Sequence, residues 1–232
     1  MNHVVKKNGF TIVELMLAMT FVATLLVSIS MTIIQISNIY NRGLTLKDVN
    51  QAGSSIASEL ERSIKETSSF SLDEGSGHYI IQADQGGRLC LGNYSYLWNY
   101  GSKLKSPNTL YNQYSDTIYN RSNPIRFVKV PDTDNSYCID LAKKVDYTNS
   151  TELLGSGQHD LALHNFSISK GASDVKTGQS LYSISYIIGT NDEDSFVDNN
   201  IVCLPPTAAN SDPSYCYIND FSIIVRSGNM MD

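Results

Sequence analysis

The sequence predicts an α+β protein in which one long N-terminal helix, membrane-spanning in its first half, packs on an antiparallel β-sheet head. Three observations lead to this prediction. Residues 10–39 form an apolar run whose single formal charge is Glu14. A polar segment with helical spacing of its apolar residues follows, as far as about residue 66. Beyond it, short segments rich in β-branched and aromatic residues alternate with turn-like sequences, as expected for strands and hairpins.

The apolar run has the length of a membrane helix, since about 20 apolar residues cross the ~30 Å hydrocarbon core. Lys6 and Lys7 precede it, which places the N-terminus in the cytoplasm and the head outside. An ordinary secretory signal has a shorter apolar core of roughly 7–15 residues followed by a small-residue cleavage site. No such site follows here. A simple membrane anchor fits the length but leaves Glu14 unexplained, because a buried carboxylate costs roughly 2.5–3.5 kcal/mol on insertion.

Gly9 and Glu14 together offer an explanation. Gly9 lies between the lysines and the apolar run, and without a side chain it lets a protease approach the backbone closely. Cleavage after Gly9 would make Phe10 the new N-terminus, with a positive amine one helical turn from Glu14. Two charges about 4 Å apart attract by about 4 kcal/mol at an effective dielectric of about 20. The pairing works best between neighbouring copies, so Glu14 is predicted to act in assembly.

The stretch KKNGFTIVEL, residues 6–15, resembles the class III signal of type IV pilins and pseudopilins. The resemblance covers residues 6–40 well. It implies that residues 1–9 are a leader with basic residues Lys6 and Lys7, cut between Gly9 and Phe10 by a prepilin peptidase. It also implies N-methylation of Phe10 and extraction of the helix from the membrane into a filament core.

The partners implied by the resemblance are other pilin subunits, the prepilin peptidase/methyltransferase, the inner-membrane assembly platform and, before assembly, the membrane itself. The implied location is the cytoplasmic membrane, as a single-pass protein with its head outside, and then a cell-surface or periplasmic filament. The implied function is that of a structural subunit, a minor pilin or pseudopilin, of a type IV pilus or type II secretion-like filament. Many major pilins carry a proline where Met31 stands here, and their heads are often shorter. A major pilin subunit and a membrane-anchored adhesin that does not polymerise remain the alternatives.

The helix is expected to continue beyond the membrane, over residues 10–67 in all, about 85 Å for the first 57 residues at 1.5 Å per residue. Apolar or small residues recur at steps of three or four on one face of its second half: Leu46, Val49, Gly53, Ile56, Leu60 and Ile64. Gly43 is the one expected soft point. This face should cover the head.

Residues 68–232 are expected to form one globular, β-rich head. The predicted strands lie in YIIQA, RLCLG, IRFVKV, SYCIDLA, LALHNFSIS, SLYSISYIIG and DFSIIVR. The turn-like sequences DQGG and PDTDN separate the first and second pairs of these strands and predict antiparallel hairpins.

The four cysteines predict disulfides, because the head is expected outside the cytoplasm. They contain no CxxC pair and no zinc-like spacing with histidine. Three pairings are possible. Cys203–Cys216 is favoured because it closes a short loop rich in Pro, Asn and Ser, and this leaves Cys90 for Cys138. Buried free thiols are the alternative.

Several functions are not supported by the sequence. A net charge of −6 does not favour a nucleic-acid groove, which normally needs a basic face. No GxSxG, Walker or HExxH motif is present, so neither an enzyme nor a cofactor is predicted. The acidic loop with Asp192, Asp194 and Asp198 fails the EF-hand pattern, because Phe196 and Val197 stand where that pattern needs Asp or Asn and then Gly. A solvated hairpin loop is predicted there, and no metal site.

A tyrosine-rich segment is the remaining candidate for recognition. Six of the fourteen tyrosines and the single tryptophan fall between Asn93 and Tyr119, mixed with Asn, Ser and Gly. This composition is typical of recognition surfaces. Trp98, Tyr111 and Tyr114 are the candidate contact residues. The alternative is a strand and loop packed on the sheet through aromatic rings, since tyrosine also favours strands.

Overall fold

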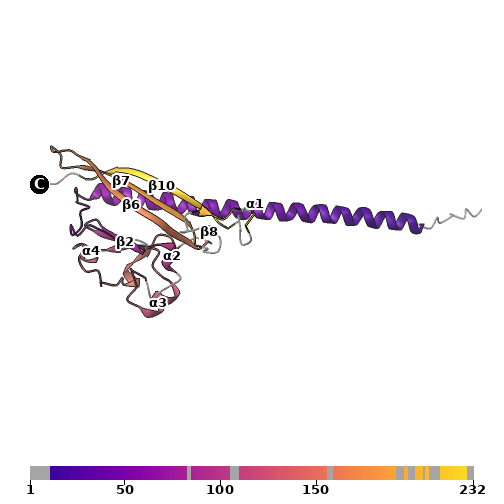
Figure 1. Ribbon diagram of the computed structural model, residues 1–232, viewed down its shortest axis with the longest axis horizontal. Coiled ribbons are helices and arrows are strands. Elements are labelled where there is room, and N and C mark those ends of the chain that lie inside the picture. Colours follow the sequence, from indigo (N-terminus) through magenta and orange to yellow (C-terminus); the bar gives the residue numbers. More distant parts are fainter. Residues whose placement is uncertain are drawn as a thin grey trace, which may run out of the picture. The chain divides into compact units, whose positions relative to one another are not determined.

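The computed structural model describes residues 11–82, 85–104, 110–155, 159–191, 196–197, 202–205, 207–208 and 215–228. The chain divides into two compact units, Met1–Gly43 and Leu44–Asp232. Helix α1, Ile12–Glu66, runs through the boundary between them (Figure 1). The predicted long helix is therefore confirmed over 55 residues, and it continues through Gly43 without a break.

The described part of the first unit is the apolar half of α1. Its hydroxyl side chains donate hydrogen bonds to carbonyl oxygens three or four residues earlier in the same helix, as Thr20 does to Leu17, Ser28 to Thr24 and Thr32 to Ser28. These back-bonds satisfy polar groups inside the helix itself, which an apolar surrounding requires.

The second unit begins with the polar half of α1, which forms the centre of the head. The buried residues of this half are Thr45, Val49, Gly53, Ile56, Leu60, Ser63 and Ile64. The predicted apolar face is thus confirmed except at Leu46, which is 41% exposed. Thr45 is buried one position earlier instead.

The head contains two antiparallel sheets where the sequence suggested one. The first has the strand order β1-β2-β3-β4-β5: β1 is Tyr79–Gln82, β2 Gly86–Cys90, β3 Tyr94–Asn99, β4 Phe127–Pro131 and β5 Thr151–Glu152. The second has the order β10-β7-β6: β6 is Leu161–Ser173, β7 Ser180–Thr190 and β10 Ile218–Arg226. A two-stranded ribbon joins β8, Phe196–Val197, to β9, Val202–Cys203.

Short helices complete the head: α2 is Gly101–Leu104, α3 Thr117–Ser122 and α4 Ser136–Ile139, and a 3₁₀ turn covers Tyr147–Asn149. The predicted strand in SYCIDLA is wrong, because its first four residues form α4. Asp132 accepts hydrogen bonds from the backbone amides of Ser136 and Tyr137, and Asn135 adopts a left-handed φ of 52°. PDTDN therefore starts a helix, and β4 pairs with β3 and β5 instead.

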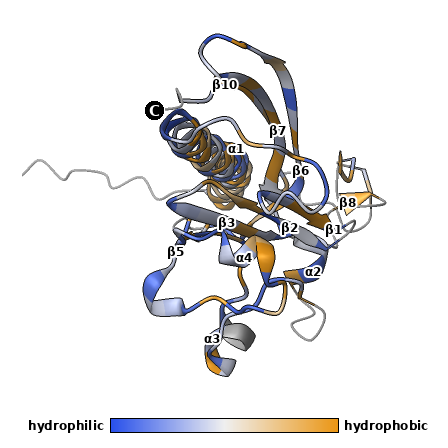
Figure 2. Cartoon of the chain, turned by 90° about the vertical axis from the view of Figure 1, so that its left-hand side faces the viewer, coloured by the Kyte–Doolittle hydropathy of each residue, from blue (hydrophilic) through white to orange (hydrophobic). Residues whose placement is uncertain are grey.

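The main hydrophobic core lies where α1 meets both sheets (Figure 2). Ile56 and Leu60 of α1, Trp98 and Phe127 of the first sheet, and Tyr186 of the second all belong to it. A second core covers the other face of the first sheet and includes residues from the segment between Leu97 and Val145. The central strands β2, β3 and β4 of the first sheet therefore have a hydrophobic core on each face, and every residue of β2 is buried.

Candidate functional site

The first turn of α1 is held by three reciprocal hydrogen bonds between Thr11 and Glu14. The backbone amide and the hydroxyl of Thr11 both donate to Oε2 of Glu14, at 2.9 and 2.8 Å. The backbone amide of Glu14 donates in return to the Thr11 hydroxyl at 3.3 Å. This is a capping box, in which Thr11 caps the helix and Glu14 is its third residue.

The capping box gives Glu14 a local role that the sequence reasoning missed. The signal for it was present as T-x-x-E ahead of an apolar run. The carboxylate satisfies an amide that would otherwise lack a partner at the start of the helix. The predicted leader residues Lys6, Lys7, Gly9 and Phe10 lie outside the described residues, so cleavage, N-methylation and the pairing of Glu14 with an amine stay predictions.

The apolar half of α1 presents large hydrophobic side chains around its whole circumference. Every residue of 11–40 is exposed, including Phe21 at 62% and Ile33 and Ile34 at 60%. This helix is long and apolar enough to cross a membrane, by its length and composition. Such a surface is unusual for a soluble protein, because soluble proteins rarely expose contiguous apolar patches larger than a few hundred Å².

Polar contacts fasten the other half of α1 to the head. Glu59 accepts hydrogen bonds from Lys129 on β4 and from the Tyr96 hydroxyl on β3. Nearer the start of the head, His159 lies between Asp48 and Thr45, with its ring nitrogens 2.7 and 3.1 Å from their side-chain oxygens. Both contacts are partly buried, so this half of α1 is a built-in element of the head.

Two of the three candidate residues in the tyrosine-rich segment, Trp98 and Tyr114, lie in the core, and the expectation of a recognition surface is wrong for them. Trp98 is fully buried, with its ring 4.4 Å from Phe166 and 5.9 Å from Phe127. Tyr114 is 3% exposed, and its ring meets Tyr147 edge-on at 5.5 Å. Both rings are enclosed because β3 has a hydrophobic core on each of its faces.

Tyr111 is half-buried and lies against a buried arginine. The guanidinium of Arg88 is 5.3 Å from the Tyr111 ring centre. Arg88 donates to the Asn112 side chain and to the carbonyl oxygens of Tyr137, Asp140 and Leu141. Burial lowers the pKa of Arg88 from its usual value. This arginine fastens the loop after α4 to β2, and Tyr111 covers it.

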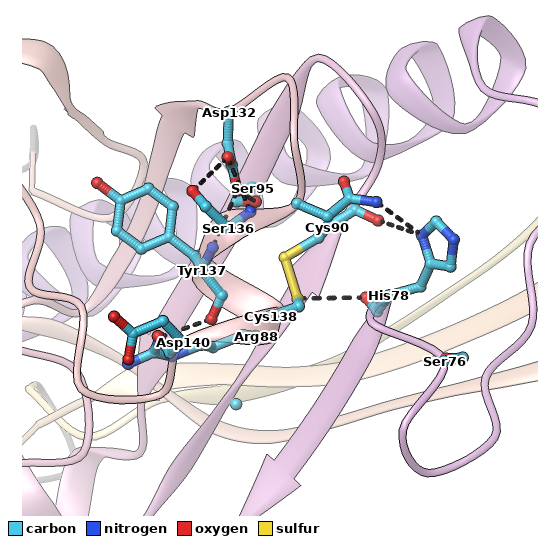
Figure 3. Close-up of a disulfide and its surroundings, with 12 residues drawn as sticks. Ser76, His78, Arg88, Cys90, Ser95, Asp132, Ser136, Tyr137, Cys138 and Asp140 are labelled. Carbon is cyan, nitrogen blue, oxygen red and sulfur yellow. Dashed lines mark hydrogen bonds between the residues drawn. A yellow bond between two sulfur atoms is a disulfide. The ribbon is translucent and has the colours of Figure 1, made fainter.

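Both predicted disulfides are present. Cys90 of β2 is bonded to Cys138 of α4, with Cα atoms 6.2 Å apart (Figure 3). Cys203 of β9 is bonded to Cys216, just before β10, with Cα atoms 5.8 Å apart. The alternative of free thiols is excluded, because all four cysteines are paired.

The predicted acidic loop, with Asp192, Asp194 and Asp198, lies outside the described residues. Among the residues that the structure does describe, no three His, Cys, Asp or Glu side chains gather as a metal site would need.

Comparison with known proteins adds no neighbour to this picture: no family model, no curated protein and no solved structure matches the chain significantly.

Proposed function

We propose that this chain is a structural subunit of a type IV pilus or type II secretion-like filament, a minor pilin or pseudopilin that assembles through its N-terminal helix. It begins as a single-pass protein of the cytoplasmic membrane with its head outside, and the peptidase that removes residues 1–9 is its first partner. Assembly then moves the apolar half of α1 from lipid into the core of a filament made with other subunits.

The observation that carries this proposal is that the two halves of one continuous helix have different surroundings. The polar half of α1 is part of the head, where its apolar face is buried against two sheets. The apolar half has all its side chains exposed and needs an apolar surrounding of its own. Lipid and a bundle of like helices both meet that need. The sequence of residues 6–15 adds the means of passing from one to the other.

The capping box favours a second candidate function, a membrane-anchored adhesin that does not polymerise. Because Thr11 already accounts for the Glu14 carboxylate, no second copy is required to explain why that residue stands there. A helix cap contributes about 1 kcal/mol, typically 0.5–2, which is smaller than the insertion cost of roughly 2.5–3.5 kcal/mol at a membrane centre. The cap alone therefore offsets that cost only in part.

Glu14→Gln separates the two functions, because glutamine also serves as the third residue of a capping box but carries no charge. Thr11→Ala is the matched control, since it removes the hydroxyl from the cap and leaves the carboxylate. As a subunit, Glu14→Gln should be processed normally, but its affinity for the filament should fall about tenfold or more if the charge pair contributes about 1.4 kcal/mol, and less of it should be recovered from sheared filaments. Thr11→Ala should still enter filaments.

The intact mass of the protein provides the second measurement. Cells with the peptidase should yield a chain shortened by nine residues, and Gly9→Val should keep the leader because a β-branched side chain crowds the backbone at the cut. Normal processing of Gly9→Val would remove the main support for a pilin. Filament yields of Glu14→Gln equal to wild type would leave Glu14 as a cap only.

A further inference from the structure

The second sheet has one face on the core and one face free of it. Along β7, Tyr182, Ile184, Tyr186 and Ile188 are buried in the main core. The residues between them point the other way, since successive side chains in a strand alternate between faces. These are Leu181, Ser183, Ser185 and Ile187. The outer face built on β6, β7 and β10 is therefore a separate surface (Figure 2).

The strand register aligns the outer-face residues in three rows across the sheet. The rows are Asn165–Ile187–Asp220, Ser167–Ser185–Ser222 and Ser169–Ser183–Ile224. Five of these nine residues are serine. Neighbouring strands lie about 4.7–4.9 Å apart, so the middle row is a line of hydroxyl groups at that spacing. The hydroxyl oxygens of Ser167 and Ser185 are 3.1 Å apart, which places them in hydrogen-bond contact.

Small side chains leave a groove of about 190 Å³ over the first two rows. Its lining consists of Asn165, Ser185, Tyr186, Ile187, Asp220, Phe221 and Ser222. The short serine side chains form the floor of the groove. Asn165 and Asp220 lie at its opposite edges, because they belong to the two outer strands of the sheet. Ile187 lies between them and is half-buried. The groove thus combines one apolar patch with an amide, a carboxylate and hydroxyls.

The polar groups at its edges have no partner among the described residues. The side chains of Asn165, Asp220 and Ser222 are exposed and make no hydrogen bond or ion pair with another residue in the part of the chain that the structure describes. An amide donates and accepts, a carboxylate accepts, and a hydroxyl does both. A ligand rich in hydroxyl groups can satisfy all three at once.

We propose that this groove binds a neutral glycan, one sugar ring at a time. The volume is below the roughly 300–1,000 Å³ of pockets for drug-sized ligands, and a single ring is the appropriate size. Sugar hydroxyls would donate to Asp220 and exchange hydrogen bonds with Asn165 and Ser222. The C–H face of the ring would lie on Ile187.

The charge and composition of the groove favour a neutral glycan over anionic ligands and over a second copy of this chain. Its lining has one carboxylate and no basic side chain, so phosphate, acidic sugars and nucleic acid are disfavoured. Protein interfaces are enriched in Tyr, Trp and Arg and depleted in Ser and Asp. The outer-face rows are rich in serine, and none of their nine residues is aromatic or basic. A second copy of this chain is therefore a poorer fit than a glycan.

Single-site binding in so open a groove is weak, and the filament of the proposed function would raise it by presenting many copies. The groove itself does not depend on assembly. A test on one copy therefore succeeds or fails independently of the filament.

The test is saturation-transfer difference NMR on the full chain in a detergent without sugar groups. The probes are methyl α-mannopyranoside, methyl β-galactopyranoside and methyl β-N-acetylglucosaminide, with the methyl glycoside of N-acetylneuraminic acid as the acidic comparison. Asp220→Ala and Asn165→Ala alter the groove. Ser183→Ala is the matched control, because Ser183 is exposed on the same face but does not line the groove. Thermal melting of each variant verifies that the head is folded.

At least one neutral glycoside should give a signal, and its Kd, titrated from that signal, should rise about tenfold or more in Asp220→Ala and in Asn165→Ala, a loss equivalent to about 1.4 kcal/mol. Ser183→Ala should keep the signal, and Asp220→Asn should restore part of it, because an amide oxygen still accepts. The proposal is overturned if none of the neutral probes binds, if only the acidic sugar binds, or if the two groove variants leave the signal unchanged. If no glycoside binds and the Ser222→Cys variant forms a disulfide between two copies of the chain, the face serves self-association instead.

Discussion

At the scale of single residues, the structure places several charged or aromatic side chains in locations that decide their role. Glu14 caps the helix that it begins, and Trp98 fills the core beside the helix. Asp132 lies four residues before α4 begins and accepts hydrogen bonds from two serine hydroxyls and two backbone amides. Each of these roles depends on the immediate neighbours of one side chain.

Replacing Trp98 or Tyr114 with alanine should destabilise the head by about 3–5 kcal/mol, because each removes a buried aromatic ring. Tyr111→Ala should cost less, since this side chain is only half-buried and its hydroxyl has no hydrogen-bond partner among the described residues. Tyr215→Ala is the control, as Tyr215 is 47% exposed. Thermal melting checks the order. Unchanged melting of Trp98→Ala would contradict its place in the core.

Asp132 should make the stability of the head depend on pH. Burial acts to raise the pKa of Asp132, but hydrogen bonds from Ser95, Ser136 and the Tyr137 amide together lower it below its usual 3.8. A lowered carboxyl pKa contributes stability that is present above the unfolded pKa and is lost as pH falls through the folded one.

Asp132→Asn should therefore lower the melting temperature at pH 7, and the difference from wild type should shrink as the pH is brought below about 3.8, where the unfolded chain takes up the proton. Melting curves from pH 7 to pH 3 test this. Asp134→Asn is the control, because Asp134 is exposed and, within the described ranges, its side chain accepts a hydrogen bond only from Thr133. A difference between Asp132→Asn and wild type that stays constant over this range would contradict the role of the ionised carboxylate.

At the scale of elements, α1 is one helix in two surroundings, and the space around each of its two glycines shows the difference. A Cβ added at Gly43 would meet no atom within 4 Å. A Cβ added at Gly53 would lie 2.1 Å from Cζ of the Phe221 ring. That ring stacks on Tyr186 at 5.4 Å, and the Tyr186 hydroxyl donates to the carbonyl oxygen of Gly53. Gly53 is therefore where β7 and β10 approach the helix backbone.

The two glycines should respond to alanine with opposite signs. Alanine favours a helix by about 1 kcal/mol over glycine at either position. Gly43→Ala should gain up to that amount. At Gly53 overpacking costs about 1–3 kcal/mol and should outweigh the gain, so that Gly53→Ala melts at a lower temperature than wild type. A stabilised Gly53→Ala would mean that Phe221 moves aside freely.

At the scale of the whole molecule, two disulfides tie together segments that strand pairing leaves separate. Cys90–Cys138 joins β2 to α4 across 48 residues, and Cys203–Cys216 joins β9 to the start of β10 across 13. A cross-link restricts the unfolded chain more when the loop that it closes is longer.

Replacing each cysteine pair with alanine should destabilise the head unequally. The chain-entropy estimate is about 4 kcal/mol for Cys90–Cys138 and about 3 kcal/mol for Cys203–Cys216. The first pair is also the more deeply buried, with Cys90 fully covered. Thermal melting of the two double variants, compared with reduced wild type, measures both losses. A larger loss from Cys203 and Cys216 would contradict the loop-length argument.

The sequence by itself determined the features that rest on local spacing. The helix from Ile12 to Glu66 followed from an apolar run joined to a pattern with a step of three or four. The β1–β2 hairpin followed from two short strand-like segments separated by the turn-like DQGG, and the short loop between Cys203 and Cys216 led to both disulfides. The capping box was equally readable, because its four residues are contiguous. Interactions between residues close in the chain need no knowledge of the fold.

Only the tertiary structure decided which surfaces are buried. Two sheets enclose α1 where one was expected, since strand pairing joins segments far apart in the chain. Trp98 lies in the core because β3 is covered on both faces. The composition of its segment resembles that of an exposed binding segment, and composition alone therefore did not reveal this burial. The serine rows form a surface because three strands that are separate in the sequence pair side by side and align their serines. Burial and register depend on long-range packing, which the order of residues along a single strand does not specify.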